Sequence, residues 1–397
     1  MNDVFAVRPA RQDDDGESTP AQAQGGAGAN PTPSNRSALT TPIQHLVEVA
    51  STHQVTMLGD QRGVAQHLDV LAKSIGPLHS AGVANLVWEF TNSRRQADLD
   101  QLCQGSEWDR RLAVALFVDL MGIGFGYDEY VDVLHAVWQH NQDRPQGWPP
   151  FRVVAAGLAS YVEDPDLLDG RSAAETELRD WWLGGHYRDI AATHLANIVT
   201  AEVLRGGERA VVYADGPRTN TNLVEFVDSR PILTPGILLA NWLGEGLARV
   251  VFHGAIDDSD ALDRVEELIA ASPDPESTFG LALDRSTLGS VRVHGLQGAV
   301  DGELAPFDLA ELADGYLFVA PRSEWLVVTL TPDLLAPDTL KAAERRYRAI
   351  DPRDTAYTQA ELELVRIEGH ADLETSWPTT AVEPDLGEGK RRLFRRH

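Results

Sequence analysis

The sequence predicts an α/β protein with a mainly parallel sheet flanked by helices and with an inserted helical cap. Short apolar runs alternate with longer segments in which apolar residues recur at helical spacing, a pattern typical of strands joined by crossover helices. Three of the apolar runs end on charged residues, within 55–62, 86–89 and 210–218. A further helical block at about 94–145 stands where a plain doubly wound fold has one crossover helix, and this block is the predicted cap.

The expected elements follow this alternation from one end of the chain to the other. The first unit is strand 53–58, a helix near 64–75 and strand 83–88, joined by a right-handed crossover. The helix is predicted because its leucines and its isoleucine fall on one face. After the helical block, the expected order is strand 151–158, a helical stretch at 173–204, strand 209–214, helix 235–245, strand 247–252, helix 260–271, strand 279–283 and an apolar run at 315–319.

The two ends of the chain differ from its middle in composition. Residues 1–38 are rich in Asp, Gly, Pro, Ala, Ser and Gln, and they cannot bury enough apolar surface to offset the entropy lost on ordering. We therefore expect a disordered N-terminal arm at 1–38, the α/β domain at 39–369, and a flexible tail with a basic end at 370–397.

Composition excludes several classes of partner. Acidic residues outnumber basic ones by 60 to 34, for a net charge of −26, so the surface repels polyanions and no nucleic-acid partner is expected. The basic run at 390–396 is interpreted as a solvated tail or an intramolecular partner for the acidic body. The single cysteine, Cys103, excludes a disulfide framework and a thiolate metal cluster. Because no secretory signal or bilayer-spanning stretch is present, we expect a cytoplasmic protein without a membrane partner.

The charges at the strand ends are the main candidates for a functional site, because the carboxyl ends of parallel strands converge on one crevice. They are Asp60, Arg62, Glu89, Asp215 and Arg218. Burial at the end of a strand would raise the pKa of Glu89 unless a cation pairs with it. Asp60 taken alone also fits a helix cap or a braced glycine turn, and Asp215 also fits an ordinary turn.

A second set of candidates lies at 186–194. Arg188 begins a predicted helix, and we expect either Arg62 or Arg188 to be the cation that pairs with Glu89. His186 and His194 are each compatible with a functional or a purely structural role.

The order of these motifs resembles the erythromycin-esterase-like and ChaN-like group of the Tiki superfamily over residues 40 to 330. That group has a strand running into Leu-Gly-Glu followed closely by His, and a later strand that ends near a second His. In this sequence Asp60 stands at the glutamate position, Arg62 at the first histidine position and Arg218 near the second. Arginine is neither a neutral base nor a metal ligand at ordinary pH, so we expect no metal and no cofactor. The other resembling stretches are Val87-Trp88-Glu89-Phe90, Tyr187-Arg188-Asp189-Ile190-Ala191 and Val211 to Arg218.

The resemblance implies hydrolytic or related acyl chemistry on a polar or anionic small molecule or a peptide. In that interpretation Glu89 is the general base or orients water, with Asp60 as its neighbour and Arg62 as the third catalytic residue. The substrate-binding residues are then Arg188, Asp215, Arg218 and His186.

Two other functions stay open at this point. The first is a catalytically inactive relative that binds a small molecule or a protein partner, because an Arg–carboxylate network can be purely structural. The second is haem binding, as in the ChaN-like branch, for which an exposed ligand such as Tyr213 or His253 is needed. A homo-oligomer is compatible with each of these functions.

Overall fold

The computed structural model describes residues 39–118, 127–158, 187–221, 225–227, 230–256, 258–271, 278–293 and 307–341. The predicted arm at 1–38 and the predicted tail at 370–397 lie outside these residues, as does the basic run. No helix in the described ranges combines the length and the apolar composition needed to cross a membrane.

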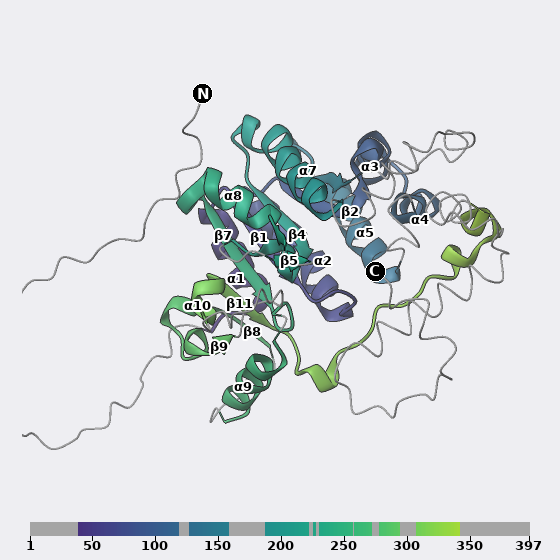
Figure 1. Ribbon diagram of the computed structural model, residues 1–397. Helices are drawn as coiled ribbons and strands as arrows, with labels where there is room; N and C mark the ends of the chain where they lie inside the picture. Colours follow the sequence, from purple (N-terminus) through teal and green to yellow (C-terminus); the bar gives the residue numbers. More distant parts are fainter. Residues whose placement is uncertain are drawn as a thin grey trace, which may run out of the picture. The chain divides into compact units, whose positions relative to one another are not determined.

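The centre of the fold is a seven-stranded sheet with the strand order β3-β2-β4-β1-β7-β11-β8 (Figure 1). Every neighbouring pair is parallel except β8 and β11, which are antiparallel. The predicted α/β class with a mainly parallel sheet is therefore confirmed. The strands are β1 (Val55–Asp60), β2 (Asn85–Asn92), β3 (Arg152–Gly157), β4 (Ala210–Asp215), β7 (Leu247–Phe252), β8 (Phe279–Ala282) and β11 (Gly315–Phe318).

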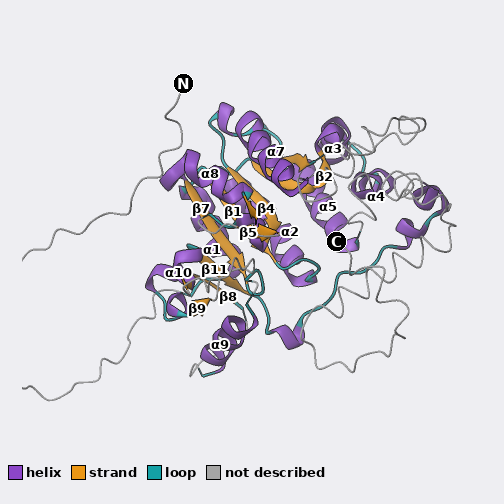
Figure 2. Ribbon diagram, in the orientation of Figure 1, coloured by secondary structure: helices purple, strands orange, loops and turns teal. Residues whose placement is uncertain are grey.

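Helices lie on both sides of this sheet (Figure 2). They are α1 (Pro42–Thr52), α2 (Ala65–Ser80), α3 (Gln96–Gln104), α4 (Arg110–Val118), α5 (Asp128–Asp143), α7 (Tyr187–Glu202), α8 (Pro235–Leu243), α9 (Ser259–Ala270) and α10 (Leu309–Leu312). Two short antiparallel pairs lie outside the sheet: β5 (Glu225–Val227) with β6 (Arg230–Ile232), and β9 (Arg292–Val293) with β10 (Phe307–Asp308). The sequence reasoning did not assign α1, although Thr41 and Gln44 form a capping box around its first turn.

Alternating side chains of the central strands build two core layers, one on each face of the sheet. On one face, Leu58, Trp88 and Tyr213 pack with α1, α2, α3, α4 and α5. On the other face, Met57 and Val87 pack with α7 and α8. The inserted helical block therefore covers one sheet face and belongs to the main core. A third cluster joins α9 and α10 to β8 and β11.

Candidate functional site

Neighbouring strands bring ionisable side chains to one edge of the sheet. The strands β2, β4, β1 and β7 are adjacent in that order, and Asp215 and Asp60 stand opposite each other where β4 and β1 end. Glu89 follows Trp88, the residue at which the regular register between β2 and β3 is interrupted. His253 comes directly after β7. The expectation that the strand ends share one location is thus met for Asp60, Glu89 and Asp215.

Glu89 is a nearly buried carboxylate, with a side chain that is 10% exposed. Its Oε2 lies 2.7 Å from Nε of Arg218, and its Oε1 accepts a hydrogen bond from the backbone amide of Asp215 at 3.1 Å. Burial raises the pKa of Glu89, the positive charge of Arg218 opposes that rise, and the negative charge of Asp215 adds to it. Glu89 therefore holds a proton more readily than an exposed glutamate does.

Arg62 pairs with Asp215 at two points. Its Nε donates to Oδ1 of Asp215 at 3.1 Å, and its Nη2 contacts Oδ2. The Arg62 side chain is 45% exposed, so this guanidinium lies at the border between the site and solvent. We expect Arg62 or Arg188 to be the cation that pairs with Glu89; the ion pair described for Glu89 is with Arg218, and the side chain of Arg188 is not among those described.

Asp60 pairs with His67 of α2. Oδ1 of Asp60 lies 2.6 Å from Nδ1 of His67, and both side chains are buried. Burial raises the pKa of Asp60, while the hydrogen bond and the charge of His67 act to lower it. The carboxylate end of β1 is therefore joined to the first turn of α2.

Sequence reasoning missed His67, although a signal for it exists. His67 shares the buried face of α2 with Leu71 and Ile75, at helical spacing. A histidine inside an apolar stripe needs a polar partner. Asp60, seven residues earlier, is the carboxylate at the end of the preceding predicted strand and is a candidate for that partner.

The candidates on the later segment are only partly described. His186 lies outside the described residues. Arg188 belongs to the first turn of α7, as predicted, but its side chain is not among those described. His194 places Nε2 at 2.9 Å from Oγ of Ser93, and burial lowers the pKa of His194. The structure therefore leaves Arg188 and His186 as predictions.

The turn that carries Arg218 is fixed from below by a buried arginine. This 3-10 turn, η5 (Gly216–Thr219), follows β4. The guanidinium of Arg249 donates to Oγ1 of Thr219 at 3.0 Å, to the carbonyl of Gly216 at 3.3 Å and to the carbonyl of Leu312 at 2.5 Å. Burial lowers the pKa of Arg249 to about 9, although the charge of Asp314 acts to raise it. A side chain at Gly216 would overlap the carbonyl of Ala255, so both sides of the turn are closely packed.

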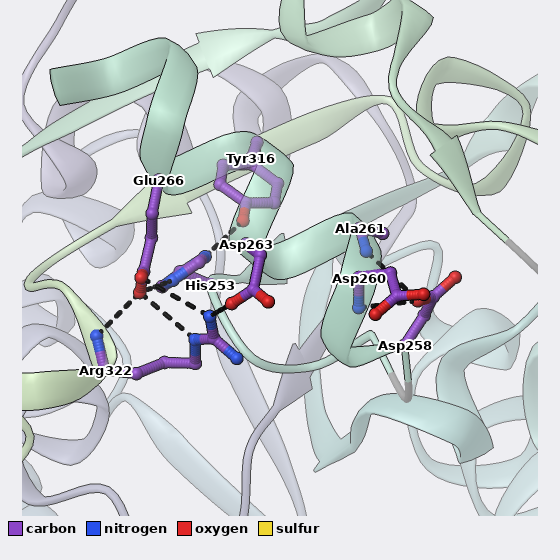
Figure 3. A network of polar contacts seen from close by, with 8 residues as sticks. All are labelled: His253, Asp258, Asp260, Ala261, Asp263, Glu266, Tyr316 and Arg322. Atoms are coloured by element: carbon purple, nitrogen blue, oxygen red, sulfur yellow. Dashed lines mark hydrogen bonds and ion pairs between the residues drawn. The ribbon is translucent and has the colours of Figure 1, made fainter. Parts of the chain in front are cut away.

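A second polar network surrounds Glu266 of α9, near the end of β7 (Figure 3). His253 places Nε2 at 2.9 Å from Oε1 of Glu266 and Nδ1 at 2.5 Å from the Tyr316 hydroxyl. The same Oε1 accepts hydrogen bonds from the backbone amide of Arg322 at 2.8 Å and from its Nε at 3.2 Å. Nη2 of Arg322 also contacts Asp263. This network ties β7, β11, α9 and the 3-10 turn η9 (Arg322–Glu324) together.

The two residues considered as haem ligands are enclosed. Tyr213 and His253 are fully buried, and both ring nitrogens of His253 already have partners. Neither offers the exposed ligand that haem binding needs. Among the described residues, no group of three or more His, Cys, Asp or Glu side chains is placed to hold a metal ion.

A shallow cavity of about 560 Å³ lies at the opposite edge of the sheet. It is lined by residues that precede β1, β2, β4 and β7, among them His53, Ala84, Arg209 and Gly246. This is the amino-terminal edge of the strands, and the charged strand ends lie at the other edge.

Comparison with known proteins finds a likeness in fold only. No protein-family model matches the sequence, and no curated protein matches it. Among solved structures, a variant of the erythromycin esterase EreC in its open conformation is 11% identical, with a TM-score of 0.49, over 71% of this chain and 98% of that one. A succinoglycan biosynthesis protein is also 11% identical, with a TM-score of 0.49, over 72% of this chain and 91% of that one. ChaN of Campylobacter jejuni, whose structure shows cofacial haem binding, is 13% identical with a TM-score of 0.27, over 53% of this chain and 85% of that one. Likeness at this level assigns no reaction and no ligand to this chain.

Proposed function

We propose that this protein is an enzyme of the hydrolase type, which cleaves an ester or amide in a polar or anionic small molecule or peptide. The observation that supports this proposal is the state of Glu89. It is a nearly buried carboxylate at the carboxyl edge of a mainly parallel sheet, its pKa is raised by burial, and Arg218 lies 2.7 Å away. Such a combination is typical of groups that exchange protons during catalysis.

The neighbouring charges suit the rest of the reaction. Glu89 orients a water molecule and exchanges a proton with it, and the water oxygen attacks the carbonyl carbon. The guanidinium groups of Arg62 and Arg218 offer hydrogen bonds to the oxyanion that forms, or to a substrate carboxylate. The proton is then returned to the leaving alcohol or amine, and the products are an acid and that alcohol or amine. We place this activity in the cytoplasm, where a free buried thiol such as Cys103 is common.

The test compares two glutamates at opposite edges of the sheet. Wild-type protein, Glu89→Gln and the control Glu208→Gln are assayed on p-nitrophenyl esters and p-nitroanilides with neutral and carboxylate-bearing acyl groups. Glu208 is a suitable control because it is also hydrogen-bonded, to Asn85 at 2.8 Å, but lies before β4. We expect Glu89→Gln to lose at least about 100-fold in kcat while calorimetry still detects substrate binding. Full turnover by Glu89→Gln would contradict the proposal.

A second candidate function is binding without catalysis, and one observation favours it. The two arginines of the site whose side chains the structure describes already have oppositely charged partners: Arg62 with Asp215, and Arg218 with Glu89. In this case Arg62→Ala and Arg218→Ala would lower the melting temperature and leave ligand affinity unchanged. In the enzyme, the same changes raise KM for carboxylate-bearing substrates more than for neutral ones.

A further inference from the structure

The hydrogen bonding of His67 leaves one of its ring nitrogens able to accept a proton. Its Nδ1 lies 2.6 Å from Oδ1 of Asp60. An ionised Asp60 only accepts hydrogen bonds, so beside it the neutral imidazole carries its proton on Nδ1 and leaves the lone pair of Nε2 available. That Nε2 atom is buried and has no hydrogen-bond partner among the described residues. Buried polar atoms without a partner are rare in folded proteins, and each of them requires an explanation.

Two aromatic rings hold the imidazole in place. Phe252, the last residue of β7, stacks on it with ring centroids 4.3 Å apart and planes inclined by 11°. Trp325 meets it edge-on at 6.1 Å. The Asp60 contact and the two rings together restrict rotation of His67. They keep its Nε2 atom in one orientation, as proton transfer to a positioned group requires.

Trp325 belongs to residues 321–331, which include the 3-10 turn η9 and which we call the strap. Trp325 is 8% exposed, whereas the next residue, Leu326, is 63% exposed. The indole therefore points inward against His67, and the strap separates the imidazole from solvent.

We propose that His67 is a catalytic residue of the site, accepting a proton at Nε2 with Asp60 as its positioning partner, and that the strap is the cover that moves to admit substrate. This inference rests on the proposed function. It adds a second proton-transfer group to Glu89, on the other side of the Arg62–Asp215 pair, since Asp60 lies on β1 and Glu89 on β2, with β4 between them.

The hydrogen bonds described for the middle of the strap are all neutral, while Trp325 and Val328 add apolar packing. Val327 forms an isolated antiparallel bridge with Val64, in the turn after β1. The side-chain amide of Gln66 extends this pairing, because its Nε2 donates to the carbonyl of Glu324 at 2.8 Å and its oxygen accepts from the amide of Leu326 at 3.0 Å. These contacts can break and re-form without burying or exposing a charge.

The two ends of the strap are anchored by carboxylates. At one end, Glu266 accepts hydrogen bonds from Arg322. At the other end, the carboxylate of Glu129 accepts hydrogen bonds from the amide and the hydroxyl of Thr329, at 2.7 Å and 2.9 Å. Charged contacts at both ends and an uncharged middle suit a segment that lifts between two fixed points.

The proposed hydrolysis balances in protons. Water loses one proton to Nε2 of His67 as its oxygen bonds to the acyl carbon, and the imidazolium that forms is stabilised by the Asp60 carboxylate. In this scheme His67 takes the water proton in place of Glu89, and Glu89, whose pKa is raised by burial, supplies the proton that the leaving group takes as its bond to the acyl carbon breaks. Deprotonated Glu89 and protonated His67 then exchange protons with solvent to restore the starting state.

The first part of the test compares two histidines on the same helix. His67→Asn is matched with His79→Asn, because His79 is also buried in α2 and hydrogen-bonded, to His140 at 2.8 Å. On the ester panel, we expect His67→Asn to lower kcat by about 100-fold or more and to remove a limb of the pH–rate profile, while His79→Asn keeps both. A Glu89→Gln protein that is inactive beside a fully active His67→Asn protein overturns this inference and leaves the proposed function standing.

The second part locks the strap without changing His67 or Asp60. Val64 and Val327 flank each other as a non-hydrogen-bonded antiparallel pair, because the amides of Ala65 and Val328 make the bonds on either side. Such pairs have Cα atoms about 4.5 Å apart, which a disulfide can span. The double variant Val64→Cys/Val327→Cys should be inactive when oxidised and active after reduction. The native Cys103 is buried and does not compete for this bond.

The outcomes of the two experiments are separable. The lock stays informative where His67→Asn fails to fold, because the reduced and oxidised forms share one sequence. Equal turnover by the two forms overturns the covering role of the strap. If the wild-type protein hydrolyses no ester or amide of the panel, the proposed function fails, and this inference fails with it.

Discussion

Glu89 and Glu266 are both paired with an arginine, yet their surroundings act on them in opposite directions. Glu89 has Arg218 on one oxygen and one backbone amide on the other, and burial raises its pKa. At Glu266 burial also acts to raise the pKa, but the hydrogen bonds from His253 and Arg322 lower it to about 2. Three donors on one carboxylate oxygen outweigh the loss of water at Glu266, whereas one ion pair and one backbone amide do not at Glu89.

This difference in pKa shift separates a glutamate that can exchange protons from a glutamate that stays ionised. A carboxylate held ionised by several donors cannot take up a proton at neutral pH, so Glu266 serves as a clip between α9 and the start of the strap. Burial raises the pKa of Glu89, so at neutral pH its protonated form lies closer in free energy to its ionised form than in an exposed glutamate, which favours proton transfer. Ionisable residues in one fold can thus be sorted by the number of donors they receive.

The largest expected effect is on folding. Replacing Glu266 by Gln removes the charge that accepts hydrogen bonds from His253 and Arg322, and should cost about 3 kcal/mol in the free energy of unfolding. Urea denaturation at pH 7 measures this cost. The control is Glu267→Gln, because Glu267 is an exposed neighbour whose only described partner is Arg264; its change should stay within about 0.5 kcal/mol. Equal changes in the two variants would mean that the network does not stabilise the fold.

A smaller effect is expected in acid. The folded-state pKa of Glu266, about 2, lies below its ordinary value of 4.5, so its contribution to stability is fully present above pH 4.5 and is lost as pH falls towards 2. Allowing for the partial exposure of the side chain, this loss is about 2 kcal/mol. The difference in unfolding free energy between wild-type and Glu266→Gln proteins should therefore shrink between pH 4.5 and pH 2. A constant difference would show that Glu266 is not held ionised.

The sheet was predictable from the sequence because its signal is local. Apolar runs at 209–214 and 247–252 lie within one residue of β4 and β7 as observed. Strand β1 reaches two residues beyond its predicted end, since Gly59 and Asp60 still pair with β4 through their main chains. The main-chain hydrogen bonds of a strand continue past the last apolar side chain, so hydropathy places the end of the strand too early.

The charged residues of the site were predictable, but their partners were not. Strand ends identify Glu89 and Asp215, whereas the choice of Arg218 for Glu89 depends on the geometry of a turn 129 positions further along the chain. His67 and Arg249 were missed because each is a polar residue within a mostly apolar element. Spacing in a sequence shows which face of an element a residue occupies, but it does not show which polar atom on a facing element will be its hydrogen-bond partner.

The smallest expected effect, and the sharpest contrast with Glu266, is the stability of Glu89→Gln. Because burial raises the pKa of Glu89, its contribution to stability is fully present below pH 4.5 and declines as pH rises through the folded-state value. Because burial makes the ionised form of Glu89 costlier than that of an exposed glutamate, its replacement by neutral glutamine should change the free energy of unfolding at pH 7 by less than about 1 kcal/mol, even though Arg218 loses its partner. On acidification from pH 7 to pH 5 the difference should move in favour of the wild-type protein, opposite in direction to the change for Glu266. Urea denaturation across that range measures it. A loss of stability as large as that of Glu266→Gln would show that Glu89 stabilises the fold in the way that Glu266 does. In that case, no carboxylate near Arg218 at the carboxyl edge of the sheet would be free to exchange protons.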